Sequence, residues 1–169
     1  MTRTLALVLA VFGALAFGSG AAPLASPLSR CGVSQVRHIA RVGWVVVGTG
    51  PVRLGLFQTR RAEISIAQSV PDRQGWRGEK TPWYVPKVYR GPVTVTAQRI
   101  DRPGQVRFAF GYGQHLRKLV FDRNGLMRNP VGPFYFAMPS ASLFRSAGCY
   151  AFHVSGRSFS ERLVVRVVT

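Results

Sequence analysis

Hydrophobic and polar positions alternate along much of this chain with a period of two residues. In the closing run 158–168 the alternation is regular, and from Leu163 onward every second residue is Leu or Val. A period of two is typical of a β-strand with one buried face. The run 149–154 comes just before it, separated by the short turn segment 155–157. The end of the chain is therefore predicted to form a β-hairpin, with Cys149 at its opening.

Seven further short runs either alternate or are continuously apolar, and turn-forming residues bound each of them. These runs are 42–47, 52–57, 63–67, 93–98, 106–110, 116–121 and 134–138. The turns include segments rich in glycine, proline, aspartate and asparagine at 48–51, 101–104, 111–113 and 124–125. Two longer segments, 70–86 and 140–147, are predicted to be loops, the second with at most one helical turn.

About nine short strands at a spacing of roughly ten residues predict an all-β fold. We expect an antiparallel, immunoglobulin-like β-sandwich of about 7–9 strands. The alternative, an α+β domain, needs amphipathic helices, and the pattern predicts none longer than two turns.

The N-terminus has the pattern of a secretory signal peptide. Arg3 supplies a positive start, residues 5–17 form an unbroken apolar run, and residues 18–22 are small. We expect cleavage after Ala21, which removes residues 1–21. The alternative is an uncleaved anchor, but the apolar run is shorter than the ~20 residues that span a bilayer as a helix.

The exported chain would then consist of a leader, 22–41, and a single β-sandwich domain, 42–169. Its two cysteines are Cys31 in the leader and Cys149 near the end. Two cysteines in an exported chain are expected to form a disulfide, although two separate buried thiols or an intermolecular bond are alternatives. Arg30, directly before Cys31, argues against lipid attachment at that cysteine.

The chain is strongly basic, with 23 lysine and arginine residues against six aspartate and glutamate residues and a net charge of +17. Such a charge attracts polyanions at long range, and salt weakens the attraction. The alternative is arginine-rich codon usage, with no ligand involved. The arginines are spread over most of the chain rather than clustered, which favours this compositional explanation.

Several short motifs can be picked out along the chain, from the N-terminus to the C-terminus. They are Cys31, Lys-Thr-Pro-Trp-Tyr at 80–84, Tyr-Arg-Gly-Pro at 89–92, Arg-Ile-Asp-Arg-Pro-Gly at 99–104, Gly-Tyr-Gly at 111–113, Gly-Cys-Tyr at 148–150 and the closing strand at 163–167. In these motifs the chain resembles a loose group of uncharacterised bacterial secreted proteins. It departs from them at Tyr150, where tryptophan is more usual, and after the first cysteine. The resemblance implies a sandwich with paired cysteines, and it implies no catalytic or binding residue.

The residues needed for common catalytic and metal sites are scarce or scattered. No Gly-x-Ser-x-Gly segment is present, and His38, His115 and His153 follow no motif. The six carboxylates are too few and too dispersed to predict a glycosidase pair or a calcium site. Three isolated histidines and two oxidised cysteines do not predict a zinc site. We therefore expect a protein that is not an enzyme and has no cofactor or metal, with a cryptic hydrolase as the least favoured alternative.

The strongest binding candidate is the segment 73–90, which interleaves aromatic rings with cations. The candidate residues are Arg73, Trp76, Arg77, Lys80, Trp83, Tyr84, Lys87, Tyr89 and Arg90. Rings beside cations can grip sugar faces or the bases and phosphates of single strands. The alternative is that Trp83 fills the core, whereas Trp76, in glycine-rich surroundings, is expected to be more exposed.

We accordingly predict a secreted or envelope-associated binding module that contacts an anionic polymer or surface through arginine-rich loops. The alternative is a structural or accessory envelope protein with no specific ligand. We expect no transmembrane segment after signal cleavage and no specific nucleic-acid motif, and a protein partner stays open.

Overall fold

The computed structural model describes residues 31–39, 44–57, 59, 61–110, 114–122 and 129–169. These residues form fourteen β-strands and no helix, which confirms the all-β prediction. The strands are β1 (Val36–Ile39), β2 (Trp44–Val47), β3 (Arg53–Leu56), β4 (Glu63–Ser65), β5 (Arg77–Lys80), β6 (Trp83–Pro86), β7 (Val93–Arg99), β8 (Arg107–Ala109), β9 (Lys118–Phe121), β10 (Asn129–Val131), β11 (Tyr135–Met138), β12 (Ala141–Phe144), β13 (Gly148–Gly156) and β14 (Phe159–Val168). Within the described ranges, no helix is long and apolar enough to cross a membrane.

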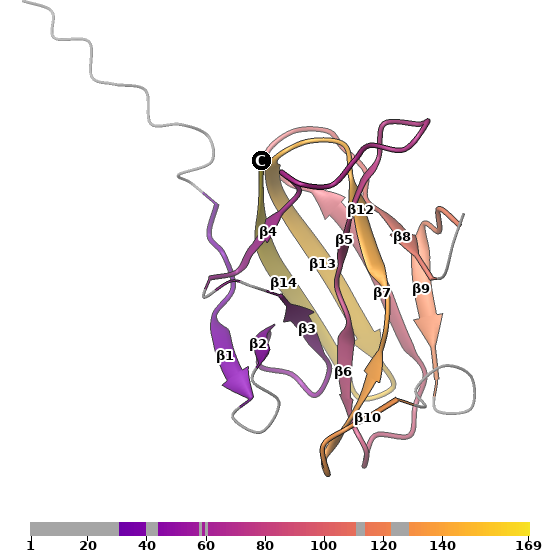
Figure 1. Cartoon of the computed structure of the whole chain (residues 1–169). Coiled ribbons are helices and arrows are strands. Elements are labelled where there is room, and N and C mark those ends of the chain that lie inside the picture. Colours follow the sequence, from indigo (N-terminus) through magenta and orange to yellow (C-terminus); the bar gives the residue numbers. More distant parts are fainter. Residues whose placement is uncertain (1–30, 40–43, 58, 60, 111–113, 123–128) are drawn as a thin grey trace, which may run out of the picture.

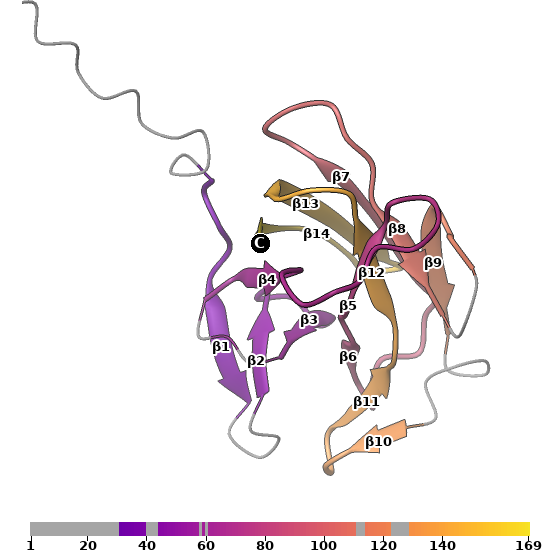
Figure 2. The same cartoon turned by 45° about the horizontal axis from the view of Figure 1, so that its top comes forward.

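The strands form three sheets (Figures 1 and 2). A six-stranded sheet has the order β1-β2-β3-β6-β11-β10, and a five-stranded sheet has the order β4-β14-β13-β7-β9. A smaller, three-stranded sheet has the order β5-β12-β8. The pairings are antiparallel except that of β14 with β4, which is parallel.

A long two-stranded ribbon joins the six-stranded sheet to the three-stranded sheet. Strand β6 pairs with β11 in the first, and β5 pairs with β12 in the second. Pro82 and Pro139 lie at the junction, and proline cannot donate a hydrogen bond to a ladder. The Thr81 amide instead donates to the Ser140 carbonyl at 2.8 Å, and the Ser140 hydroxyl donates to the Thr81 carbonyl at 2.7 Å. The ribbon therefore passes between sheets while its two strands stay hydrogen-bonded.

The main core is shared by all three sheets. Phe152 of β13 is fully buried, and its ring centroid lies 5.9 Å from that of Trp83 on β6 and 6.2 Å from that of Phe108 on β8. The β13–β14 hairpin is the predicted one, and Leu163 and Val165 on its inner face are likewise buried. Sheets that cover one another in this way bury the apolar face of each strand and leave the other face to solvent.

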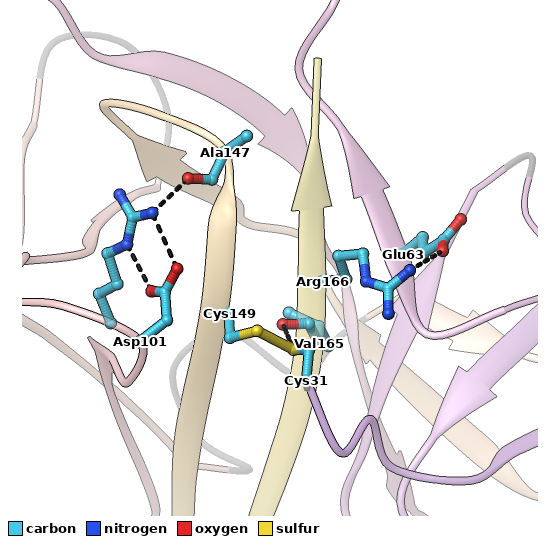
Figure 3. The surroundings of a disulfide bond; sticks show 8 residues. Cys31, Glu63, Asp101, Ala147, Cys149, Val165 and Arg166 are labelled. Atoms are coloured by element: carbon cyan, nitrogen blue, oxygen red, sulfur yellow. Dashed lines mark hydrogen bonds and ion pairs between the residues drawn. A yellow bond between two sulfur atoms is a disulfide. The ribbon is translucent and has the colours of Figure 1, made fainter. Parts of the chain in front are cut away.

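The disulfide lies on the outer face of the five-stranded sheet, away from the main core (Figure 3). Cys31 is bonded to Cys149, and their Cα atoms are 5.7 Å apart. With Ala151 and Val164 the two cysteines form a separate small apolar cluster. Residue Ser34 continues the attachment, because its amide donates to the Val164 carbonyl and its hydroxyl accepts from the Val164 amide, both at 2.8 Å. The structure thus confirms the predicted pairing.

All nine predicted runs contain a strand, and five strands come in addition. Strand β1 lies in the segment predicted as a leader, β5 and β6 lie in the predicted loop 70–86, and β12 lies in the predicted loop 140–147. Strand β10 is the fifth. The loop predictions are wrong because the prolines at 82 and 139 separate two strands each, rather than marking irregular chain. The expected count of 7–9 strands is too low, and the two prolines account for β5, β6 and β12 but not for β1 and β10.

Some predictions lie outside the described residues. They are the signal peptide with its cleavage site and the turns at 111–113 and 124–125. The immunoglobulin-like character of the fold stays a prediction.

Candidate functional site: an arginine cleft

A cleft of about 610 Å³ opens at the end of the molecule where β7 ends and β13 begins. Its lining includes four arginines and two aromatic residues: Arg99, Arg102, Arg107, Arg145, Trp76 and Tyr150. These residues come from five separate parts of the chain, which the β7–β13 and β8–β12 pairings bring to one end.

Arg99, the last residue of β7, is held by more partners than any other cation in the cleft. Its Nε and Nη2 atoms donate to the two carboxylate oxygens of Asp101 at 2.6 and 3.0 Å. Its Nη1 atom donates to the Ser146 hydroxyl at 2.6 Å, and Nη2 also donates to the Ala147 carbonyl at 2.5 Å. Figure 3 shows Asp101 and Ala147 beside the start of β13, close to Cys149. A two-point arginine–carboxylate contact of this kind fixes orientation as well as position.

The Arg99–Asp101 contact shifts the pKa of both groups in the stabilising direction. The hydrogen bonds from Arg99 lower the pKa of the Asp101 carboxyl. The hydrogen bonds to Asp101 raise the pKa of the Arg99 guanidinium in turn. Asp101 lies in the predicted turn 101–104, and its carboxylate also positions an arginine.

Glycine is required at position 148 because the Arg99 guanidinium packs directly over its backbone. A Cβ atom at this position would collide with the Arg99 Nη2, Cζ and Nε atoms. Arg99 also lies over the Tyr150 ring, with its Cζ atom 5.6 Å from the ring centroid. Arg99 is therefore part of the framework of the cleft, and its charge is balanced by Asp101.

Two further arginines cover the ring of Trp76. The Cζ atom of Arg145 lies 4.7 Å from the ring centroid, and that of Arg107 lies 5.7 Å from it. Trp76 is only 5% exposed, so its ring acts as a platform under the cations rather than as an open stacking surface. The two guanidinium groups are thereby held at the cleft with their charge still available.

The Trp76 platform is fixed by the loop that precedes β5. The Asp72 carboxylate accepts hydrogen bonds from the Gln74 amide at 2.8 Å and from the Trp76 amide at 3.0 Å. These bonds, the Trp76 amide first, lower the pKa of the Asp72 carboxyl. The other oxygen of Asp72 lies 2.9 Å from Nε2 of His115, whose ring meets Trp76 edge-on at 6.1 Å.

Three cleft arginines have no carboxylate partner among the described residues: Arg102, Arg107 and Arg145. Within the described part of the chain, Arg102 donates to the Ser146 hydroxyl, at 3.3 Å. The planar guanidinium group of arginine presents a fork of two parallel N–H donors. This fork matches carboxylate, sulfate and phosphate oxygens in geometry as well as in charge. The cleft therefore has the chemistry of an anion-binding site.

The structure does not bring the predicted site residues together on one surface. Trp83 and Tyr84, on β6, are 0% and 1% exposed, so their interpretation as surface contacts is wrong and the core-filling alternative holds for Trp83. Burial also raises the pKa of the Tyr84 hydroxyl. Trp76 is buried rather than more exposed as expected, because Arg107 and Arg145 cover its ring.

The remaining predicted residues are divided between the two ends of the molecule and the strand between them. Arg73 is exposed near the cleft, and Arg77 in β5 donates to the Ser69 carbonyl at 2.9 Å. Lys80, at the end of β5, is exposed. Lys87, Tyr89 and Arg90 follow β6 at the opposite end. The segment 73–90 is split because two successive strands, each rising ~3.3 Å per residue, carry it along the length of the molecule. Ligand binding by the surface cations of the segment 73–90 stays a prediction.

Sequence reasoning missed the four cleft arginines as a group. Arg99 and Arg102 belong to the 99–104 motif, but Arg107 and Arg145 reach the cleft only through the pairing of β8 with β12. Spacing along the chain contains no signal for such a pairing. The one available signal was the Arg-x-Asp sequence at 99–101, which brings a cation and a carboxylate together at the end of a strand.

A second hollow, of about 330 Å³, contains two carboxylates. Glu63 and Glu79 both line it, beside Lys80. Burial raises the pKa of the Glu79 carboxyl, whereas Glu63 lies 3.5 Å from the Arg166 guanidinium in an ion pair.

No protein-family model matches this chain, and no curated protein sequence matches it. Among solved structures, it is similar to a "putative lipoprotein" from Bacillus anthracis, with a TM-score of 0.48 and 8% identity over 81% of this chain and 86% of that one. It is also similar to the CooA pilin subunit from enterotoxigenic Escherichia coli, with a TM-score of 0.41 and 12% identity over 70% of this chain and 96% of that one. At these scores the two likenesses carry no information about the activity or partners of this chain.

Proposed function

We propose that this protein is an extracytoplasmic, non-enzymatic binding module that captures an anionic polymer in the arginine cleft. The observation that supports the proposal best is the set of three arginines, Arg102, Arg107 and Arg145, that line one cleft without a carboxylate partner among the described residues. Because Arg107 and Arg145 already rest on Trp76, little side-chain entropy is lost when an anion binds.

The disulfide supports the extracytoplasmic part of the proposal. Cys31 and Cys149 are 118 residues apart in the sequence and form a bond across the outside of a sheet. Disulfides of this structural kind persist in oxidising compartments and are rare in the cytosol. The basic charge would then act outside the cytoplasm, where anionic polymers and surfaces are available to it.

A polymer fits the cleft better than a single small ion. The cleft of about 610 Å³ is much larger than one phosphate or sulfate group, and its arginines are presented by separate strands and turns. A chain with repeated carboxylate or sulfate groups would place one group at each guanidinium. Its long-range attraction to the basic surface would raise the rate of encounter, while the cleft would supply selectivity.

The test is titration calorimetry of the protein with a heparin hexasaccharide of defined length. Replacement of the three arginines by alanine, R102A/R107A/R145A, is expected to weaken binding by at least about a hundredfold, because charge-assisted hydrogen bonds are lost at three positions. Thermal unfolding of the variant checks that the Trp76 region still folds.

A matched control removes the same charge elsewhere. Arg37, Arg117 and Arg162 are exposed and lie outside the cleft lining. The variant R37A/R117A/R162A is expected to weaken binding by only a few fold, through the general loss of positive charge. Equal weakening by both triple variants would show that net charge alone holds the polymer and would contradict the proposal.

The second hollow gives a specific reason to keep a hydrolase as the second candidate. Two carboxylates that face one hollow, one with a raised pKa, are the minimum for general acid–base hydrolysis of a glycosidic bond. A screen with chromogenic glycosides would test it. Turnover that disappears in Glu79→Gln would support this candidate, whereas turnover unchanged in Glu79→Gln would assign it to a contaminant.

A further inference from the structure

The end of the molecule opposite the cleft carries two apolar side chains in solvent, each on a turn. Val88, in the connection that follows β6, is 83% exposed, and Phe134, in the turn between β10 and β11, is 60% exposed. Both turns lie at the lower end of the molecule in Figure 1, and the β13–β14 hairpin closes at the same end. Two apolar side chains as exposed as these, at one end of the molecule, can serve as contacts for an external partner.

The two turns are fixed to one another, so they form one surface. The Lys87 amide donates to the Phe134 carbonyl at 2.9 Å, and the Lys87 ammonium donates to the Gly132 carbonyl at 3.1 Å. Gly132 has a φ of +62°, a left-handed conformation that glycine adopts without strain and that sharpens the turn. The Lys87 ammonium also lies 5.6 Å from the ring centroid of Phe136.

Three cations belong to the same two turns and to the adjoining hairpin. Arg90 follows Val88 closely, and its Nη1 atom donates to the Lys87 carbonyl at 3.0 Å. Arg157, in the turn of the β13–β14 hairpin, is exposed, and its amide donates to the Tyr89 hydroxyl at 3.1 Å. Lys87, Arg90 and Arg157 therefore supply a positive rim at the end that carries Val88 and Phe134, and we name these five residues the apolar tip.

Two described carboxylates belong to the elements that end near the apolar tip. Asp122 directly follows β9, whose last residue pairs with Val93. Glu161, on β14, accepts hydrogen bonds from the amides of Thr49 at 2.7 Å and Gly50 at 3.0 Å, which offset its charge locally. Three cations outnumber these two described carboxylates, so the net charge of the rim is positive.

We propose that the apolar tip docks on the surface of an anionic lipid bilayer. Exposed apolar side chains that enter the headgroup region, surrounded by lysine and arginine at headgroup level, are the arrangement by which peripheral proteins bind such surfaces. A soluble polyanion would engage the cations but leave Val88 and Phe134 in water. A bilayer engages both, because the arginine stems can extend their charged ends to the phosphates while the apolar side chains enter below them.

Flotation of the exported, disulfide-bonded protein with vesicles tests this proposal. Vesicles of equal parts phosphatidylglycerol and phosphatidylcholine are expected to bind the protein, and pure phosphatidylcholine vesicles are expected to bind it at least about tenfold more weakly. The variant V88S/F134S is expected to lower the affinity for the anionic vesicles by about tenfold, because the buried apolar surface is lost. R90E/R157E is expected to lower it by at least as much.

The control is Val70→Ser. Val70 is 86% exposed, as exposed as Val88, but it lies in the loop before β5 on the cleft side of the molecule. It is expected to leave vesicle binding unchanged. Absence of binding to anionic vesicles, or equal loss in Val70→Ser and V88S/F134S, would overturn the proposal. V88S/F134S should also keep its affinity for the heparin hexasaccharide, and R90E/R157E should lose only the few fold expected from the general loss of positive charge. Failure of the tip is therefore distinguishable from failure of the cleft.

Discussion

The two ends of this molecule both present arginine, but they hold it in different ways. In the arginine cleft, Arg107 and Arg145 rest on the buried ring of Trp76, and Arg99 is fixed by Asp101. In the apolar tip, the Arg90 guanidinium donates to the Lys87 backbone carbonyl, and Arg157 is exposed. Both belong to the end that carries the exposed side chains of Val88 and Phe134. The two ends are separated by the length of β13, roughly 25–30 Å for nine residues of strand.

This difference shows that net charge alone does not describe a basic protein. A cation on an aromatic platform presents its fork in a fixed direction, and that geometry suits a ligand with defined anionic groups. A cation on a flexible stem beside an apolar apex suits a fluid, laterally mobile surface. The same residue type therefore serves two kinds of partner, and the packing beneath it decides which.

The largest expected effect comes from removal of the disulfide. The double variant C31S/C149S is expected to lose ~4–5 kcal/mol of unfolding free energy, because the bond closes a loop of 118 residues in the unfolded chain. Urea unfolding with and without reductant measures the loss. Since Cys149 lies beside Gly148 and Arg99, amide exchange should speed up more at the start of β13 than at its end. Equal acceleration at both ends would show that the disulfide does not stabilise the cleft end of β13 selectively.

A smaller effect is expected from Asp101→Asn, which removes the charge that orients Arg99. We expect a loss of about 1–2 kcal/mol in unfolding free energy and a several-fold weaker cleft affinity, because two charge-assisted hydrogen bonds are lost. Vesicle binding by the apolar tip should not change. Calorimetry with the heparin hexasaccharide measures the cleft affinity of this variant, and vesicle flotation measures the affinity of its apolar tip.

The same variant has a defined signature in pH. Because Arg99 lowers the pKa of the Asp101 carboxyl in the folded protein, the contact stabilises the fold at pH values above the ordinary carboxyl pKa. This stabilisation is lost as the pH falls through the lowered value, when Asp101 takes up a proton. The wild-type protein should therefore be the more stable of the two at neutral pH, and the difference should shrink in strong acid. A difference that grew on acidification would contradict the assigned role.

How much of this could be predicted from the sequence differs between the elements. The β13–β14 hairpin and its buried face follow from local alternation, and the cysteine pairing follows from there being only two cysteines in a sequence that begins with a signal-peptide pattern. The strand β12 and the pair β5 and β6 were missed, because prolines between consecutive strands look like loop signals. The cleft was missed because Arg107 and Arg145 are 38 residues apart and meet only by strand pairing.

The smallest expected effect separates fork geometry from charge. Arg145→Lys keeps the positive charge but removes the planar fork over Trp76, and we expect a roughly threefold to tenfold weaker affinity for the hexasaccharide. Arg157→Lys at the apolar tip should change vesicle affinity by less than about twofold, because a fluid surface needs only the charge. Equal tolerance of lysine at both positions, measured by calorimetry and flotation, would show that the cleft has no geometric selectivity.

The central claim, that the cleft and not the general surface binds the anion, is tested most directly by nuclear magnetic resonance. Titration of the hexasaccharide into isotopically labelled protein reports on each arginine Nε–H group and on the Trp76 indole. We predict saturable shifts at Arg102, Arg107, Arg145 and Trp76 at ligand concentrations that leave Arg90 and Arg157 unmoved. Shifts of similar size and midpoint at all exposed arginines would contradict the claim.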